Sequence, residues 1–245
     1  MTFSIVARDP QNGWLGVATS SKALAAGAAV PFVKLGVGAI ASQSFSNPYL
    51  GIDGLALLAD GMPAERVAER VIEGDSGRDL RQLGIVDKDG RAAAYTGERC
   101  IPWAGHLIGG GYVCLGNILF GEATVKAMAE AYERSAGEPL YERLMLALEA
   151  GQEAGGDRRG RQSAGIHVIA EEEYAICDVR VDDHEQPVAE LRRVLDVYKR
   201  EEVPFLQASP RRDDFTPYWD AVLRVRDAIE TDLDEKQAVQ AAKES

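Results

Sequence analysis

A short run of arginines is the most distinctive chemical feature of this sequence. Arg158, Arg159 and Arg161 stand close together in the glycine-rich residues 155–162, which we call the arginine loop. A guanidinium group binds a carboxylate or a phosphate through two parallel hydrogen bonds. Because the whole chain has a net charge of −12, this run is a local exception in sign. The pattern indicates a site for a small anionic substrate. The alternative is that Asp157 and neighbouring acids pair with the arginines and order the loop.

Amide and hydroxyl side chains near the ends of predicted strands form a second group of candidates. Asn117 lies in an otherwise apolar run, where a buried amide needs a hydrogen-bonding partner. It could donate to a developing oxyanion, or it could satisfy a neighbouring turn. Gln43 and Ser44 end one predicted hairpin, and Ser20, Ser21 and Lys22 come just after another. Among these we expect Gln43 and Ser20 to contact a substrate.

Asp182, Asp183 and His184 stand between a predicted strand and a predicted helix. Two carboxylates and an imidazole could bind a metal or transfer a proton. Neighbouring strand residues point to opposite faces, so the three converge only if the backbone turns. Capping of the following helix by one aspartate is the better interpretation. We predict no metal site and no cofactor.

The sequence lacks the motifs of several common enzyme classes. It has no P-loop, no dinucleotide-binding fingerprint, no nucleophile elbow and no His-Glu-x-x-His pattern. His106 and His167 stand alone, and residues 109–111 form a glycine run that is typical of a turn. A conventional Ser/His/Asp hydrolase is therefore the least favoured of the enzyme hypotheses.

Hairpin patterns and helix patterns alternate along the chain. Two β-prone runs joined by a polar turn recur at residues 3–19, 30–44, 83–95 and 164–181. Helical spacing covers residues 52–72, 122–150 and 187–200, and residues 112–119 form one more predicted strand. Residues 100–111 are predicted to be a loop. Antiparallel hairpins interleaved with helix pairs predict an α+β fold of two facing antiparallel sheets with helices on their outer faces.

Length and composition limit the classes of protein. With 245 residues, 46% hydrophobic and 27% charged, the chain has ordinary globular composition. We expect one domain over residues 1–200 and an acidic, partly helical extension over residues 201–245. The acidic balance disfavours nucleic-acid and anionic-membrane partners. Three scattered cysteines, and a start without a basic segment or a long apolar run, predict an unsecreted cytoplasmic protein. Flat sandwich faces and the helical tail favour a homo-oligomer.

Three segments carry a resemblance to a known family. They are Met-Thr-Phe-Ser-Ile-Val-Ala-Arg-Asp-Pro at the start, Gly-Gly-Asp-Arg-Arg-Gly-Arg-Gln-Ser at 155–163 and Val-Asp-Asp-His at 181–184. Over residues 1–200 the chain resembles an uncharacterised bacterial domain-of-unknown-function family that is placed with the N-terminal-nucleophile (Ntn) hydrolase fold. The resemblance implies a four-layer αββα sandwich, in agreement with the element order.

The resemblance also implies a nucleophile. In the Ntn superfamily a mature N-terminal Thr, Ser or Cys attacks a carbonyl, and its own α-amine, with a pKa of about 7.7–8.0, acts as base. Removal of Met1 would place both groups on Thr2. Asn117 would then be the oxyanion donor. Proteasome-like members carry an acidic residue near the position of Ser20, so this chain departs from that arrangement.

These observations lead to two functional hypotheses. The first is an Ntn-type amidohydrolase acting on a small anionic amide, with Thr2 and Asn117 as catalytic residues. Ser20, Gln43 and the three arginines of the arginine loop would bind its substrate. The second is a non-catalytic small-molecule-binding or assembly domain on the same fold, with Met1 retained.

Overall fold

The computed structural model describes residues 2–207 and 209–244, which form two units, Met1–Asp196 and Val197–Ser245. The first unit contains two antiparallel sheets. The strands of the larger sheet are β1 (Thr2–Arg8), β2 (Leu15–Ser21), β7 (Gly105–Gly109), β8 (Tyr112–Asn117), β9 (Ser163–Ile169) and β10 (Ala175–Val181). The strands of the smaller sheet are β3 (Pro31–Lys34), β4 (Gly38–Ser44), β5 (Arg81–Asp87) and β6 (Ala92–Thr96).

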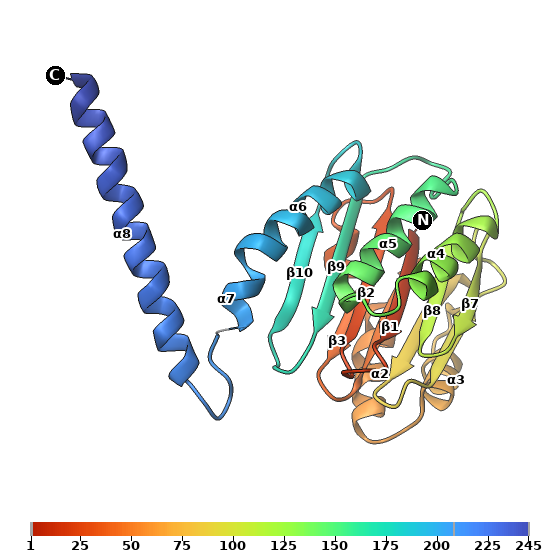
Figure 1. Ribbon diagram of the computed structural model, residues 1–245. Helices are drawn as coiled ribbons and strands as arrows, with labels where there is room; N and C mark the ends of the chain where they lie inside the picture. Colours follow the sequence, from red (N-terminus) through yellow and green to blue (C-terminus); the bar gives the residue numbers. More distant parts are fainter. Residues whose placement is uncertain (1, 208, 245) are drawn as a thin grey trace. The chain divides into compact units, whose positions relative to one another are not determined.

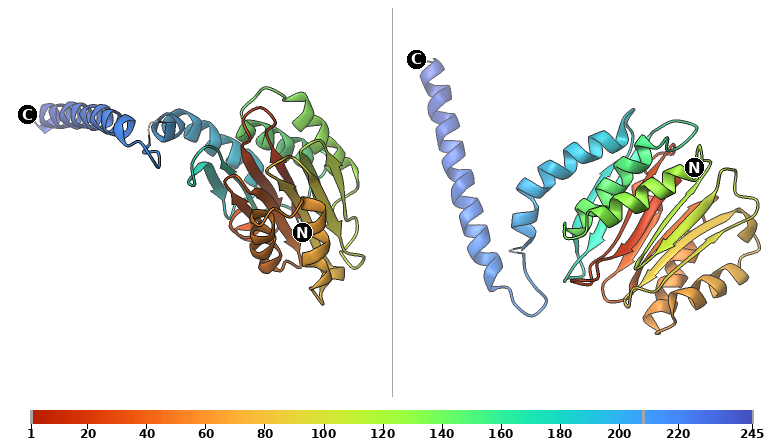
Figure 2. Two further views of the ribbon diagram at one scale, coloured as in Figure 1. Left: turned by 90° about the horizontal axis from the view of Figure 1, so that it is seen from below. Right: turned by 45° about the vertical axis from the view of Figure 1, so that its right-hand side comes forward.

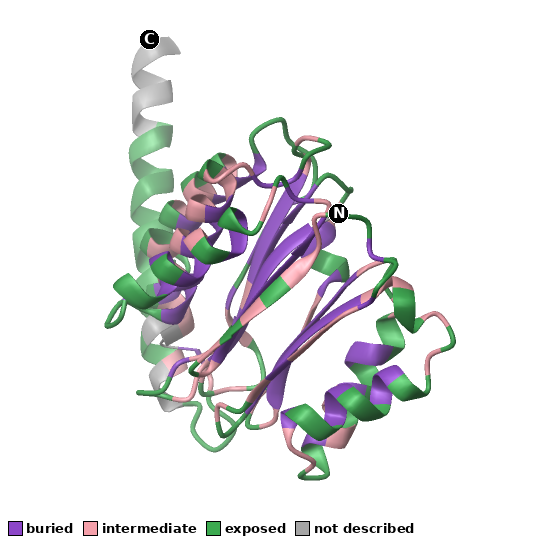
Figure 3. Cartoon of the chain, turned by 90° about the vertical axis from the view of Figure 1, so that its right-hand side faces the viewer, coloured by how far each residue is buried: buried purple, intermediate pink, exposed green. Residues whose placement is uncertain are grey.

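The two sheets face each other and have helices on both outer sides. The larger sheet has the order β10-β9-β2-β1-β8-β7 and the smaller has the order β3-β4-β5-β6. Helices α4 (Ala123–Arg134) and α5 (Leu140–Glu153) cover the larger sheet, and α2 (Pro48–Ala59) and α3 (Ala64–Glu73) cover the smaller (Figures 1 and 2). Figure 3 shows the four layers from the side. The predicted α+β class and the four-layer αββα sandwich are confirmed.

Shorter elements connect these layers. They are α1 (Ala26–Ala29) and the 3-10 turn Arg78–Leu80. Helix α6 (Pro187–Glu201) begins in the first unit and ends in the second. Local sequence explains several boundaries. Asn47 caps α2 by accepting a hydrogen bond from the Tyr49 N–H, and Pro48 occupies the first helical turn.

One predicted loop contains a strand. Residues 105–109 form β7, which pairs antiparallel with β8, so the prediction of a continuous loop over residues 100–111 was wrong. β7 has only one neighbour in its sheet, and glycines at both of its ends weaken the β-signal in the sequence. The predicted turn at residues 109–111 joins β7 to β8, with Gly111 at φ 77°.

The space between the sheets has an apolar half and a polar half. One half is packed with aliphatic side chains from both sheets, among them Val6, Val17, Ala39 and Val113. Toward the other end, the same alternating positions of the strands carry hydroxyl and amide side chains. Since side chains alternate faces along a strand, a single face changes from aliphatic to polar along its length. The polar half contains the candidate site.

The second unit is helical where the structure describes it. It includes α7 (Val203–Gln207) and α8 (Thr216–Glu244). Several large apolar side chains of α8 are exposed: Trp219 (62%), Leu223 (46%), Ile229 (54%) and Leu233 (50%). In the described part of the chain, no helix combines the length and the apolar character that a membrane span requires.

Candidate active site

Thr2 is the first residue of β1, at the polar end of the sandwich. Its side chain points between the sheets, as do those of the alternate residues Ser4 and Val6. The Thr2 hydroxyl lies 3.2 Å from the Ser21 hydroxyl, which is directly opposite on β2. On its other side Thr2 is in register with Asn117 of β8. Thr2 is therefore held between two strands, with its hydroxyl in contact with a second hydroxyl.

Gln82 is the centre of a buried amide network beside Thr2. Its side-chain oxygen accepts hydrogen bonds from Gln43 Nε2 and from Asn117 Nδ2, both at 2.8 Å. Its Nε2 donates to three acceptors on neighbouring strands, namely Thr96 Oγ1 at 3.0 Å, Gly105 O at 3.1 Å and Gly116 O at 2.8 Å. Gln43 Nε2 also lies 3.4 Å from the carbonyl oxygen of Thr2. The network thus links the backbone of the proposed nucleophile to both sheets.

Hydroxyl groups extend this network behind Thr2. Ser4 Oγ lies 2.8 Å from Thr19 Oγ1 and 2.6 Å from Gln43 Oε1. All three residues are at most 2% exposed. Buried polar groups are costly unless they are hydrogen-bonded, and these are bonded to one another. The arrangement fixes the orientation of Gln43 beneath Thr2.

Unusual backbone conformations flank the same end of the sandwich. Ser44 at the end of β4 has φ 72°, Ile118 directly after β8 has φ 51°, and Ala25 after β2 has φ 53°. Positive φ is uncommon for residues other than glycine and is an outlier for a β-branched residue such as Ile118. Such strain persists only where surrounding contacts impose it, and it gathers at functional sites. This clustering supports placing the site here.

Asp157 ties the arginine loop to β2. Its carboxylate accepts hydrogen bonds from the backbone N–H groups of Lys22 and Arg159, both at 2.8 Å. The Arg159 guanidinium lies 3.4 Å from the same carboxylate, whose side chain is 2% exposed. The backbone N–H of Arg158 donates to the Ile118 carbonyl at 3.2 Å. For Arg159, these contacts match the alternative in which Asp157 orders the loop.

The three arginines do not gather around one point. Arg158 donates to the Pro102 carbonyl at 2.5 Å, and Arg161 donates to the side chain of Gln186. Among the described residues, no ion pair joins Arg158 to a carboxylate. Arg158 is exposed, and its backbone N–H bonds to Ile118, which follows β8 at the polar end of the sandwich.

Of the predicted polar residues, some lie together beside Thr2 and one lies elsewhere. Thr2, Gln43 and Asn117 come together in the inter-sheet layer, as described above. Ser20 does not join them, because its neighbour Ser21 faces Thr2 and alternation turns Ser20 to the opposite face of β2. There its hydroxyl donates to the carbonyl of Ser163 at 3.2 Å. Ser21, one residue further along β2, therefore occupies the position beside Thr2 that we expected for Ser20.

Large apolar side chains stand exposed on the loops around this end. Leu24 follows β2, Phe45 follows β4 and Phe120 follows β8, with exposures of 66%, 56% and 69%. Ile101, 42% exposed, precedes β7 and accepts a backbone hydrogen bond from Ile118. We call these four residues the apolar rim. Exposed apolar residues that gather around a polar site favour contact with a ligand or with another protein surface.

His106 borders the network on β7. Its Nδ1 lies 2.9 Å from Thr96 Oγ1. Desolvation of the ring lowers the pKa of His106, which favours the neutral imidazole. A neutral Nδ1 can accept the Thr96 hydroxyl proton. The residue thus extends the hydrogen bonding of the network to β7.

Other titratable groups take structural positions. Asp183 accepts from Gln162 Nε2 at 3.2 Å, and His184 Nδ1 accepts from the Gln186 N–H at 2.9 Å. At the approach to α6, the side chain of His184 therefore bonds to the backbone just before the helix. In the described residues, no three His, Cys, Asp or Glu side chains come together as a metal site requires. Burial raises the pKa values of Cys114 and Cys177, which keeps these thiols protonated.

The architecture defines the fold class. Two facing antiparallel sheets between helix layers, with the first strand beginning at Thr2, give the Ntn-hydrolase-like fold expected from the sequence. The chain belongs to the family of unknown function DUF1028, whose model matches residues 2–191.

One solved structure of the same family agrees with this assignment. The crystal structure of SPO2555 from Silicibacter pomeroyi, a protein of the same family, is 30% identical, with a TM-score of 0.80, covering 87% of this chain and 96% of that one. An Anbu (ancestral β-subunit) protein of Yersinia bercovieri is 13% identical with a TM-score of 0.37, covering 81% of this chain and 97% of that one. Among curated proteins, none matches.

The residue that sequence reasoning missed is Gln82. It stands one position before the predicted strand at residue 83, so it was not assigned to a buried face. The available signal was a two-residue period of polar positions, Thr2 with Ser4 and Thr19 with Ser21, in strands that are otherwise apolar. That period indicates a polar inner layer, which needs amides from the facing sheet.

Proposed function

We propose that this chain is an Ntn-type amidohydrolase in which Thr2 is the nucleophile once Met1 has been removed. The observation that carries the proposal is the position of the Thr2 hydroxyl. It opens the first strand, faces the inter-sheet space and lies 3.2 Å from Ser21 Oγ at the polar end. Cleavage of a single peptide bond would add a free amine to the residue that bears this hydroxyl.

The chemistry follows from these groups. The Thr2 α-amine accepts the hydroxyl proton as Oγ1 attacks the amide carbon, and a tetrahedral oxyanion forms. The ammonium then gives its proton to the departing amine, which leaves an ester on Thr2. Water, deprotonated by the same amine, attacks the ester and releases the carboxylic acid. Each step therefore needs only one base, with a pKa of about 7.7–8.0 in its unperturbed state.

Neighbouring residues would orient these steps. Ser21 holds the Thr2 hydroxyl from the side, and Gln43 holds its carbonyl oxygen from below. One N–H of Asn117 Nδ2 donates a hydrogen bond to Gln82 Oε1, which leaves the second N–H for the oxyanion. Such a fixed donor is effective because it is already oriented before charge develops.

The substrate class we propose is a small amide that carries a negative group. Arg158 is the candidate for holding the anion. Its side chain is exposed, and within the described residues its guanidinium bonds to a neutral group, the Pro102 carbonyl. Arg159 and Arg161 would keep the loop in place through Asp157 and Gln186. The three buried free cysteines are compatible with a reducing, cytoplasmic setting.

Intact-mass analysis of the protein from its native host tests the proposal. Met1 should be absent, and an α′,β′-epoxyketone, which reacts with a hydroxyl and an amine on one residue, should add once. Thr2→Ser should still be labelled and Thr2→Val should not. A variant with one alanine inserted before Thr2 keeps the hydroxyl and removes the free amine, so it should also resist labelling. Retained Met1 in the host protein would contradict the proposal.

A non-catalytic role is the second candidate, and two observations favour it. The amides of Gln43 and Asn117 already bond to Gln82, so the network holds together without a substrate. The apolar rim, which includes Phe45 and Phe120, would suit an assembly surface. Under this proposal Met1 stays on the chain, and the same mass measurement distinguishes the two functions.

A further inference from the structure

β6 is an edge strand that lacks the usual protection. An exposed edge presents free backbone groups that can pair with another chain, and proteins commonly block it with charges, prolines or bulges. β3 begins at Pro31 and ends at Lys34, and β10 has a register shift between Ala175 and Cys177. The strand β6, with the sequence Ala-Ala-Ala-Tyr-Thr, has none of these features.

The backbone of β6 offers hydrogen bonds on its open side. Bonds to β5 flank the strand at Arg91 and Gly97. Because hydrogen-bonded and non-hydrogen-bonded pairs alternate along antiparallel strands, the even-numbered residues Ala92, Ala94 and Thr96 direct their N–H and C=O groups away from β5. An added strand would find these groups in register.

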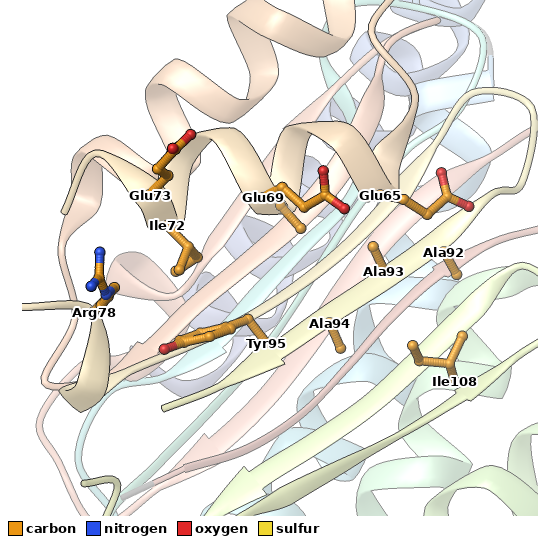
Figure 4. Close-up of a pocket in the computed structure, with 11 residues that line it drawn as sticks. Glu65, Glu69, Ile72, Glu73, Arg78, Ala92, Ala93, Ala94, Tyr95 and Ile108 are labelled. Atoms are coloured by element: carbon orange, nitrogen blue, oxygen red, sulfur yellow. The ribbon is translucent and has the colours of Figure 1, made fainter. Parts of the chain in front are cut away.

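A groove runs along this edge (Figure 4). Its volume is about 780 Å³, and it is lined by β6, by α3, by Ile108 of β7 and by one cationic side chain, that of Arg78, against three glutamates. Ala92 and Ala94 contribute small side chains, and Ile108 is 48% exposed. The groove is thus open, apolar at its base and long enough to follow the strand.

Three glutamates line the α3 side of the groove. Glu65, Glu69 and Glu73 are four residues apart, so they lie along one side of α3 at intervals of about 6 Å. Alternate side chains on one face of a strand lie about 6.6–6.8 Å apart. The two spacings match closely over three positions. Glu69 pairs with Arg66, and both side chains are exposed. Such an exposed ion pair is weak, so it competes little with a basic ligand for Glu69.

We propose that this groove binds an extended basic segment of a partner protein, which adds to β6 as a further strand. Its basic side chains, at alternate positions, would face the glutamates of α3. Its intervening apolar side chains would face Ala92, Ala94 and Ile108. Backbone hydrogen bonds would supply affinity, and the alternating pattern would supply specificity. The surface is separate from Thr2, so the proposal does not depend on the proposed reaction.

Charge favours a basic partner over a second copy of this chain. Two β6 strands paired about a two-fold axis would bring two α3 helices to the same sheet face. Each would present Glu65, Glu69 and Glu73, so like charges would meet. β6 itself contributes no basic residue to such a pair.

Two fluorescein-labelled peptides test the proposal with the full chain. One contains Lys-Val-Lys-Val-Lys-Val and the other contains Lys-Lys-Lys-Val-Val-Val, so the two have equal charge and composition. Fluorescence anisotropy should show at least tenfold tighter binding of the alternating peptide. Two further versions of the alternating peptide carry N-methyl groups, one at its odd-numbered residues and the other at its even-numbered residues. Only one of these versions should lose binding, because an added strand pairs with β6 through one of its two edges.

Two sets of variants locate the interaction. The triple variant Glu65→Gln, Glu69→Gln, Glu73→Gln should weaken binding of the alternating peptide about tenfold. The triple variant Glu171→Gln, Glu172→Gln, Glu173→Gln makes the same charge change on another turn and should have no effect. Ala94→Pro, which removes an outward N–H, should abolish binding while circular dichroism stays unchanged.

Three outcomes would overturn the proposal. One is equal binding of both peptides, because it would show unspecific attraction of charge. Another is an equal loss of binding in the two triple variants. The third is a dimer that Ala94→Pro dissociates in sedimentation experiments, because it would assign the edge to a second copy.

Discussion

The amides of Gln43 and Gln82 bond to each other at 2.8 Å from directly opposite positions of β4 and β5. Neither is more than 2% exposed. Gln43 also contacts the backbone of Thr2, and Gln82 also contacts Asn117. The pair therefore connects the first strand, the neighbouring strand of the larger sheet and the smaller sheet. Its integrity should govern the whole polar layer.

Replacement of Gln82 by leucine should be strongly destabilising. Gln82→Leu keeps a similar volume but leaves Asn117 Nδ2 and the carbonyls of Gly105 and Gly116 without their partner. Each orphaned buried group costs about 1–3 kcal/mol, so we expect a loss of about 3 kcal/mol or more in the free energy of unfolding. Urea denaturation measures it. The exposed Gln11→Leu is the control, and a loss below about 1 kcal/mol in Gln82→Leu would contradict the role of the network.

The fold was more predictable than this network. Hairpins and helix pairs leave local signals, such as polar turns and helical spacing, so the sandwich followed from the sequence. The position of Thr2 at a strand start was equally local. The partnership of Gln82 with Gln43 and Asn117 joins residues that are 39 and 35 positions apart, and register between sheets decides it. Ser20 and Ser21 show the same limit, because one residue of register exchanges their faces.

Asp157 should control the mobility of the arginine loop. Its carboxylate accepts three hydrogen bonds, from Lys22, from the Arg159 backbone and from the Arg159 guanidinium. Hydrogen bonds to charged groups contribute about 1.5–3 kcal/mol each. In Asp157→Ala, trypsin should cut after Arg158 at least tenfold faster than in the wild type, as followed by mass spectrometry. Asp183→Ala is the control, and equal rates in wild type and Asp157→Ala would refute this assignment.

Asp75 should make stability depend on acid. Arg81 Nε donates to its carboxylate at 2.7 Å, and this bond is the main reason that its pKa falls from 3.8 to about 2. Because the folded-state pKa is the lower one, ionised Asp75 stabilises the fold above pH 3.8. That stabilisation is lost as the pH falls toward 2. This lowering of the pKa corresponds to about 2 kcal/mol for the Asp75 side chain, which is 8% exposed.

The variant Asp75→Asn tests this dependence. Its free energy of unfolding should be about 2 kcal/mol below that of the wild type at pH 6, and the two should converge near pH 2. The exposed Asp53→Asn should differ from the wild type by less than about 0.5 kcal/mol at pH 6. A constant gap between Asp75→Asn and wild type from pH 6 to pH 2 would argue against a lowered pKa.

Helix α8 should mediate the homo-oligomer that the sequence predicts. The apolar side chains of Trp219, Ile229 and Leu233 are 62%, 54% and 50% exposed. Exposed apolar side chains that gather on one element favour contact with another protein surface. In sedimentation of the full chain, the wild type should be an oligomer. The triple variant Trp219→Ser, Ile229→Ser, Leu233→Ser should be a monomer. A matched variant, Asp220→Ser, Asp227→Ser, Asp234→Ser, should assemble like the wild type. A monomeric wild type at about 100 µM would exclude this proposal.

Thr2→Val should separate the chemical role of the residue from its structural role. Valine has the shape of threonine and suits a strand, and Ser21 Oγ is the side-chain contact recorded for the Thr2 hydroxyl. Unfolding free energy should therefore change by about 1 kcal/mol or less. The rate of epoxyketone labelling should fall by a factor of ~10³ or more, because the attacking oxygen is gone. In the processed wild type, that rate should rise with pH through about 7.7–8.0 as the α-amine loses its proton. A Thr2→Val protein that unfolds readily but is still labelled would leave Thr2 with a structural role alone.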